Sequence, residues 1–261
     1  MKKEKIISDL PWLAQYDPQV PHTLEYPEET VDALVRKSIK NHPQEIALIY
    51  FGYKMTYGEL GKKIDQFAGA LKNLGIKPGD KVALLMANCP QFVISFYGIL
   101  SLGAIAVPVN PLSTESELLH IFRDSQVKMV VSLDLLAERL ENVRDTLHQG
   151  GETHILVHSY YTSLNEYMKF PLKFLYLLTR KLTPGAKARL KVAKRFKELF
   201  ASNISPLTEY PSQKMDVYKD LAVLIYTGGT TGRSKGVMLS HYGLVANGLQ
   251  AISWVKMGKR D

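Results

Sequence analysis

Residues 226–237 bring together the side chains and backbone that a phosphate group needs. Four glycines let the chain bend sharply and approach a ligand closely, and the exposed N–H groups of such a loop form a concave anion site. Hydroxyl side chains add donors, and one lysine adds a flexible charge that suits a polyphosphate. The segment reads, in order, Tyr226, Thr227, Gly228, Gly229, Thr230, Thr231, Gly232, Arg233, Ser234, Lys235, Gly236 and Val237. We therefore predict a phosphate-binding loop.

Two apolar runs enclose this loop and distinguish it from an ordinary solvent loop. Leu221–Tyr226 precedes it and Val237–Leu239 follows it, and both runs are typical of strands. It is not a Walker A loop, because Lys235 is followed by Gly236 and not by serine or threonine. No Gly-x-Gly-x-x-Gly stands between a strand and a helix, so a dinucleotide site has no support.

Other residues of chemically active types favour structural roles. His241 follows the loop, and a helix-start role and a direct catalytic role both stay open. His154 and His158 lack the further ligands that a zinc ion needs. Cys89, the single cysteine, has no base next to it, which favours a structural thiol and excludes a disulfide framework.

An alternation of strand and helix patterns must position the loop. Thr56 and Thr114 each stand three residues before a glutamate, the spacing of a helix capping box, and Ser240 can cap a last helix. Strands are predicted at 46–50, 54–56, 82–86, 104–109, 127–131, 155–157, 221–226 and 237–239, with helical patterns at 60–74, 91–102, 115–123 and 135–147. Such an alternation indicates parallel strands with right-handed crossovers. The predicted fold class is α/β, a doubly wound, mostly parallel sheet with an incomplete second α/β subdomain.

Composition shifts divide the chain into four predicted parts. They are an irregular N-terminal segment with a first helix (1–45), a first α/β subdomain (46–158), a basic, aromatic insertion or linker (159–220), and the start of a second α/β subdomain with the phosphate-binding loop (221–261). The last part is expected to be truncated.

Positive charge is concentrated in one segment. Of 33 Lys and Arg residues, set against 25 Asp and Glu, ten lie in 169–197, which contains no acid. The remainder is nearly neutral, so nucleic-acid binding is not indicated. Apolar side chains between Phe170 and Leu178 accompany these cations. Two interpretations stay open: peripheral contact with an anionic membrane through 169–197, or an insertion whose Phe174 and Leu175 side chains pack on the domain together with Leu178. No apolar stretch is long enough to span a bilayer.

The loop and two shorter motifs resemble the adenylate-forming superfamily, which includes acyl-CoA synthetases, luciferases and peptide-synthetase adenylation domains. Met55-Thr56-Tyr57-Gly58-Glu59-Leu60 resembles the first core motif, and 100–111, ending Val107-Pro108-Val109-Asn110-Pro111, resembles the second. With its opening Pro11–Tyr16 and Val20-Pro21, the chain is most similar to the N-terminal half of bacterial long-chain fatty acid–CoA ligases. Ser234 stands where many members of the family carry proline.

The resemblance implies a two-step reaction that uses ATP, Mg²⁺ and CoA. A fatty acid carboxylate attacks the α-phosphorus of ATP to give acyl-AMP and pyrophosphate, and the CoA thiol then displaces AMP. In related enzymes the first loop threonine, here Thr227, approaches the metal or the phosphates. Lys235 would steady the β- and γ-phosphates and the leaving pyrophosphate.

The resemblance also implies parts that do not occur before residue 261: the adenine, ribose and metal motifs, and the lysine of a mobile C-terminal domain. We therefore assign no catalytic residue and expect the chain to be inactive alone. Another acid-activating enzyme and a non-catalytic nucleotide- or membrane-binding fragment stay open as alternatives. The expected location is cytoplasmic, with peripheral contact at the inner face of the membrane as an option. Acyl chain length and a homodimer are left open.

Overall fold

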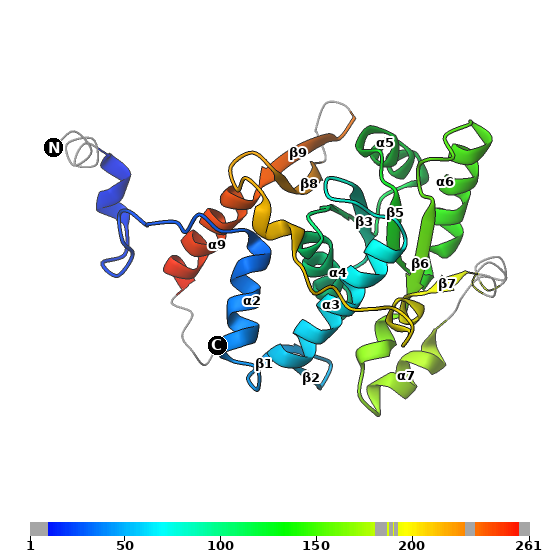
Figure 1. The fold of residues 1–261 in the computed structure, drawn as a ribbon, viewed down its shortest axis with the longest axis horizontal. Helices are drawn as coiled ribbons and strands as arrows, with labels where there is room; N and C mark the ends of the chain where they lie inside the picture. The colour runs from blue at the N-terminus through cyan, green and yellow to red at the C-terminus, as the bar shows by residue number, and fades with distance from the viewer. Residues whose placement is uncertain (1–9, 181–186, 188–189, 191–192, 228–232, 256–261) are drawn as a thin grey trace.

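A seven-stranded sheet forms the centre of the computed structural model, which describes residues 10–180, 187, 190, 193–227 and 233–255. The strand order is β7-β6-β5-β3-β4-β8-β9, and all neighbours pair in parallel except β8 and β9 (Figure 1). A separate antiparallel hairpin joins β1 and β2. The strands are β1 Ile46–Tyr50, β2 Tyr53–Thr56, β3 Lys81–Leu85, β4 Ile105–Val109, β5 Met129–Leu133, β6 His158–Thr162, β7 Lys194–Arg195, β8 Leu221–Thr227 and β9 Lys235–Ser240.

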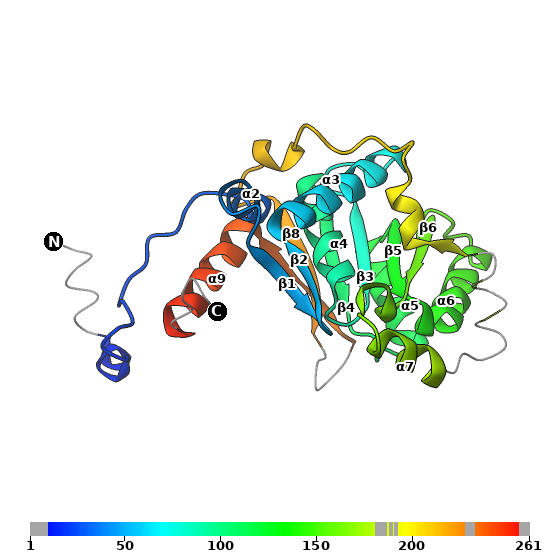
Figure 2. The ribbon, with the colours of Figure 1, turned by 90° about the horizontal axis from the view of Figure 1, so that it is seen from below.

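Helices cover both faces of this sheet (Figure 2). The α-helices are α2 Val31–Asn41, α3 Tyr57–Asn73, α4 Pro90–Ser101, α5 Glu115–Ser125, α6 Ala137–Gln149, α7 Leu172–Thr179 and α9 His241–Val255. Short 3₁₀ helices are η1 Pro11–Gln15, η2 Asp134–Leu136, η3 Leu164–Tyr167, η4 Phe196–Phe200 and η5 Pro211–Lys214. The predicted α/β class with a mostly parallel sheet is confirmed.

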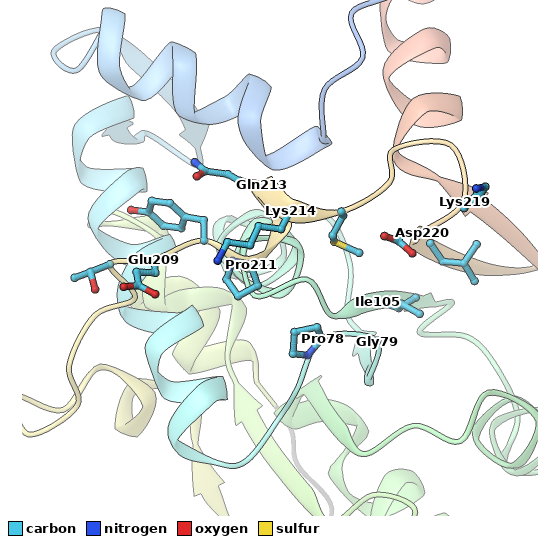
Figure 3. Close-up of a pocket in the computed structure, with 13 residues that line it drawn as sticks. Pro78, Gly79, Ile105, Glu209, Pro211, Gln213, Lys214, Lys219 and Asp220 are labelled. Carbon is cyan, nitrogen blue, oxygen red and sulfur yellow. The ribbon is translucent and has the colours of Figure 1, made fainter.

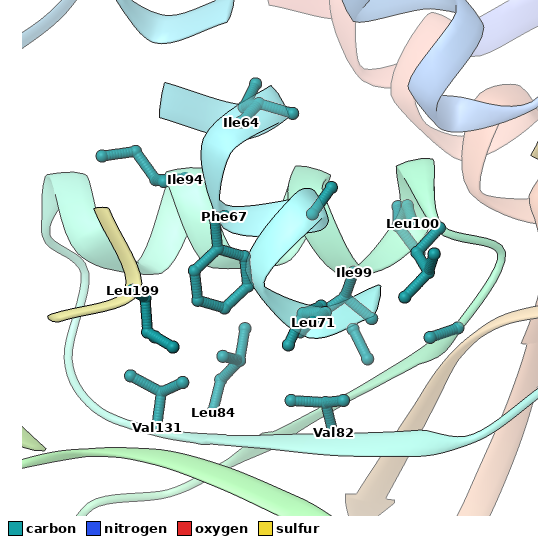
Figure 4. Packing of buried hydrophobic residues seen from close by; sticks show 14 of the residues in the cluster. Ile64, Phe67, Leu71, Val82, Leu84, Ile94, Ile99, Leu100, Val131 and Leu199 are labelled. Atoms are coloured by element: carbon teal, nitrogen blue, oxygen red, sulfur yellow. The ribbon is translucent and has the colours of Figure 1, made fainter. Parts of the chain in front are cut away.

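Alternating side chains of the central strands enter two separate cores. Val82 and Leu84 of β3 pack under α3 and α4, where Phe67 is fully buried (Figure 4). Ala83 and Leu85 point to the opposite face and pack with residues of α5 and α6. Because both faces of each central strand are buried, the strands read as continuous apolar runs in the sequence.

The helix-start predictions are confirmed. The hydroxyls of Thr56 and Thr114 each accept a hydrogen bond from the backbone N–H group of a glutamate three residues on, and the carboxylate of that glutamate accepts one from the backbone N–H group of the threonine. The Ser240 hydroxyl accepts from the Gly243 N–H group at the start of α9. These caps satisfy N–H groups that have no partner within the helix.

The strand predicted at 155–157 is wrong by three residues. Ile155 and Leu156 are fully buried in the α5–α6 core, and the backbone of Leu156 has a φ of 52° that a strand cannot include. Strand β6 begins at His158 and pairs in parallel with β5. Strand β8 joins the same sheet beside β4.

A buried aspartate ties the first helix to the rest of the domain. The Asp32 side chain is fully buried and accepts hydrogen bonds from Arg36, Ser101 and Ser212. The Arg36 guanidinium also binds Asp65 and lies 3.4 Å from the centre of the Tyr210 ring. The network therefore joins α2, α3, α4 and the segment before β8.

His241 provides a second link to α2. Its ring is fully buried, and Nδ1 accepts a hydrogen bond from the Val31 N–H group at 3.3 Å. That N–H group lies in the first turn of α2 and has no partner within the helix. His241 thus begins α9 and also caps α2, which supports the structural interpretation of this histidine.

We expect Asp32→Ala to lower the free energy of unfolding by about 3 kcal/mol, because it leaves two hydroxyls and a half-buried guanidinium without their shared acceptor. Urea denaturation measures the change. Lys37→Ala is the control, since the Lys37–Glu29 ion pair is on the surface. An equal small loss in both variants would contradict the network's role.

We expect His241→Gln to flatten the dependence of stability on pH. Burial lowers the pKa of His241 below 6.5, so below that pH the unfolded chain takes up a proton more readily than the folded chain. Wild type should therefore lose stability as pH falls from about 7 to about 5, and the variant should lose less. Urea unfolding across this range tests it, with His154→Gln as the control on an exposed histidine. Parallel profiles for wild type and His241→Gln would contradict the prediction.

Candidate phosphate-binding site

The predicted phosphate-binding loop joins β8 to β9 at one edge of the sheet. Because β8 runs parallel to β4, its last residue, Thr227, lies at the carboxyl edge of the parallel strands. Ligands of open α/β sheets bind outside this edge. Seven predicted site residues are described: Tyr226, Thr227, Arg233, Ser234, Lys235, Gly236 and Val237. The other five lie outside the described residues: Gly228, Gly229, Thr230, Thr231 and Gly232.

The antiparallel pairing of the hairpin brings the hydroxyl and the cation together. Thr227 is the direct partner of Lys235, and Tyr226 is the partner of Gly236. Opposite residues of an antiparallel pair point to the same face, so the Thr227 and Lys235 side chains lie on one face of the hairpin. Arg233, Lys235 and Thr227 are all exposed, so they are open to an anion from solvent.

Helix α5 contacts the hairpin at the end where β8 finishes and β9 begins. Tyr226 donates its hydroxyl hydrogen to Asp124, and burial raises the pKa of Tyr226, so the hydroxyl stays protonated at neutral pH. The His120 Nε2 atom lies 2.8 Å from the Ser234 carbonyl oxygen. These two α5 residues were not predicted from the sequence, because their partners lie about a hundred residues away along the chain.

The described residues offer few metal ligands beside the loop. Within the described ranges, no three His, Cys, Asp or Glu side chains gather in a way that could hold a metal ion. Thr227 supplies one exposed hydroxyl oxygen, and Mg²⁺ commonly takes its other ligands from water and substrate phosphates. The residues therefore fit a Mg²⁺ ion that arrives with a nucleotide and not a preformed protein cage.

Cys89 and the histidine pair take part in packing. Burial raises the pKa of Cys89 to about 11, and its sulfur contacts that of Met86 at 3.9 Å. His154 pairs with Gln126, whereas the His158 ring lies 3.2 Å from the Leu74 carbonyl oxygen. The two histidines therefore serve separate structural contacts.

A cavity of about 980 Å³ lies between the segment before β8 and the first residues of β4 and β8 (Figure 3). Its walls include Ile105 and Leu221, the first residues of β4 and β8, together with Pro78 and Lys214. It therefore opens at the amino edge of the parallel strands, opposite the hairpin. Size alone does not identify the site in this fold, because ligands bind at the carboxyl edge.

A second cavity of about 640 Å³ is almost wholly apolar. Leu34 of α2, Phe92 and Phe96 of α4, and Leu244 and Leu249 of α9 are among its lining residues. Helix α9, which supplies part of the wall of this cavity, directly follows β9 along the chain.

Known proteins are similar to this chain in sequence and in fold. Residues 35–261 match the AMP-binding enzyme family. A long-chain-fatty-acid–CoA ligase of Bacillus subtilis is 37% identical over 253 residues, which cover 95% of this chain and 43% of that protein. The corresponding ligase of Haemophilus influenzae is 33% identical, with 87% and 39% covered.

Solved structures agree on the fold. A putative long-chain-fatty-acid CoA ligase from Rhodopseudomonas palustris superimposes with a TM-score of 0.67 at 20% identity, covering 90% of this chain and 50% of that chain. A long-chain-fatty-acid–CoA ligase from Archaeoglobus fulgidus gives 0.63 at 19% identity, with 94% and 43% covered. The chain spans about two-fifths of the length of the curated relatives it matches. On the match over residues 35–261, this chain belongs to the family of AMP-binding enzymes.

Proposed function

We propose that this chain supplies the phosphate-binding part of an ATP-dependent fatty acid–CoA ligase. The observation that carries the proposal is the pairing of Thr227 with Lys235 at the carboxyl edge of the sheet. The long-chain-fatty-acid–CoA ligases among the relatives support the substrate class. The activity belongs to the whole protein, of whose relatives this chain spans about two-fifths.

In the first step, a fatty acid carboxylate oxygen bonds to the α-phosphorus of ATP while the bond to pyrophosphate breaks. Both reactants are anions, so charge repulsion is the main barrier to their approach. Lys235 offsets charge on the β- and γ-phosphates, and the Thr227 hydroxyl orients a phosphate oxygen. Bound Mg²⁺ supplies further charge neutralisation. In the second step, the CoA thiol displaces AMP from the acyl carbon.

A second candidate is activation of another acid by the same chemistry. A crotonobetaine/carnitine–CoA ligase of Salmonella paratyphi A is 30% identical over 191 residues, so the shared part does not by itself determine the acid. A third candidate is a nucleotide-binding protein without catalysis. Pyrophosphate release from ATP by the whole protein, measured with a panel of acids, separates the three: it depends on a long-chain acid, on another acid, or does not occur.

We expect Lys235→Ala to raise the Kd for ATP by about tenfold or more, since a charge-assisted hydrogen bond contributes about 1.5–3 kcal/mol. The Kd for a long-chain fatty acid should not change, because the proposed role of the Lys235 ammonium group is to bind phosphates. Calorimetry with each ligand measures both constants. Lys219→Ala is the matched control, since that lysine is exposed and lines the cavity at the opposite edge. A change confined to the fatty acid constant, or equal ATP effects in both variants, would contradict the assignment.

We also propose that α7 and its flanking residues contact an anionic membrane peripherally, at its inner face. The exposed fractions of Phe170 and Leu178 are 83% and 66%, and Phe174 and Leu175 are more than half exposed. The alternative prediction of a buried face through these residues is therefore wrong for this chain. None of the described helices is long and apolar enough to cross a bilayer.

The charges beside this apolar surface favour lipid headgroups. Lys169 and Lys173 are exposed on and next to α7. Gly52, at the tip of the β1–β2 hairpin, lies against Lys169, and the neighbouring Phe51 is 52% exposed and widens the apolar surface. Arg180 is not available, because it forms a salt bridge with Asp134 at 2.5 Å. Apolar side chains with lysines beside them are the composition of an interfacial helix.

We expect binding to vesicles that contain anionic lipid, and weaker binding at high salt, because salt screens exposed charges. Each lysine contributes about 1 kcal/mol at an anionic surface, so Lys169→Gln with Lys173→Gln should weaken binding about 10- to 30-fold. Phe170→Ser with Phe174→Ser should also weaken it. Leu112→Ser is the control, since Leu112 is 84% exposed elsewhere. Co-sedimentation that is equal with neutral and anionic vesicles, or absent with both, would refute contact with an anionic membrane through these lysines.

A further inference from the structure

One face of α5 contacts both sides of the β8–β9 hairpin. His120 and Asp124 are four residues apart, so they lie one above the other on the helix. The first contacts Ser234 just before β9, and the second contacts Tyr226 near the end of β8. The neighbouring face of α5, with Leu118, is buried in the core, so the helix is fixed to the domain.

The two atoms in contact show which side donates the hydrogen bond between His120 and Ser234. A carbonyl oxygen only accepts hydrogen bonds, so Nε2 of His120 must carry the hydrogen that binds Ser234. Both the neutral ring with hydrogen on Nε2 and the protonated ring satisfy this requirement. The contact therefore persists whether or not the ring carries a charge.

The contact of Tyr226 with Asp124 holds strand β8. The phenol of Tyr226 donates to the Asp124 carboxylate, and a hydrogen bond to a charged acceptor is stronger than one between neutral groups. The ring of Tyr226 also meets that of His120 edge to face, with centroids 6.3 Å apart. The two contacts thus form one unit on α5.

The Tyr226 ring limits the space beside Gly236. A Cβ atom at residue 236 would lie 3.1 Å from Cζ and 3.3 Å from the hydroxyl oxygen of Tyr226, and 3.0 Å from Cδ1 of Leu224. The ring therefore lies close to the glycine, and a side chain at residue 236 would have to displace the Tyr226 ring or Leu224 by a few tenths of an ångström. Lys235 stands between this glycine and Ser234, whose carbonyl is held by His120.

We infer that His120 and Asp124 are positioning residues for Lys235. His120 holds Ser234, and Asp124 holds Tyr226 of the partner strand, whose ring lies against Gly236. These contacts restrict where the ammonium group of Lys235 can reach. What the ammonium group binds rests on the proposed function, whereas the support from α5 rests on the contacts themselves.

The experiment compares His120→Leu and Asp124→Leu with the conservative His120→Gln and Asp124→Asn, which keep a donor and an acceptor. Arg123→Gln is the control on the same helix, since Arg123 pairs with Glu152 away from the hairpin. Amide hydrogen exchange of 226–227 and 233–237 is measured in the 261-residue chain, together with its urea stability and its Kd for ATP.

We expect the leucine variants to speed exchange in the hairpin at least tenfold while β3 and β4 stay as protected as in wild type. The Kd for ATP should rise about tenfold, and the conservative variants should recover most of both effects. Unchanged exchange in the hairpin, or an equal effect of Arg123→Gln, would overturn the inference. If wild type does not bind ATP, the proposed function fails, and the exchange data still decide the role of α5.

Discussion

The parallel pairing of β8 with β4 is the constraint on which the site depends. The strands are joined at Ala106 and Val223, more than a hundred residues apart along the chain. This pairing brings Thr227, the last residue of β8, to the carboxyl edge, where the ends of β3, β4 and β5 also lie. At that edge helix N-termini and loop N–H groups favour anions. Without this pairing, Thr227 would not be held beside the ends of the parallel strands.

Helix α5 connects this edge to the core of the domain. Leu118 and Phe122 fix the helix under the sheet, and its adjacent face contacts the hairpin through His120 and Asp124. The buried face of α5 therefore fixes the helix, and the fixed helix restricts the positions of the hairpin residues that contact its other face. The exposed surface of α7 is different in kind, because its apolar side chains face solvent and have no such anchoring role.

Local patterns predicted most of the elements, and long-range contacts account for what they missed. The capping boxes at Thr56 and Thr114 and the apolar runs of β3 and β8 depend on neighbours a few residues away, so the sequence reveals them. The start of β6 was misplaced because Ile155 and Leu156 are apolar for packing on α5 and α6, not for pairing. The contact of His120 with Ser234 spans 114 residues, and no spacing rule connects them. For the same reason the strands on either side of the glycine-rich segment could be predicted, but their contacts with α5 could not.

The central claim is that residues 226–237 bind the phosphates of a nucleotide. NMR titration of the 261-residue chain with ATP and, separately, with adenosine tests it directly, because only ATP carries the phosphates. The account predicts that ATP shifts the amide signals of Thr227, Ser234 and Lys235, and that adenosine leaves them in place. Equal shifts from both ligands, or shifts confined to the cavity around Ile105 and Leu221, would contradict it.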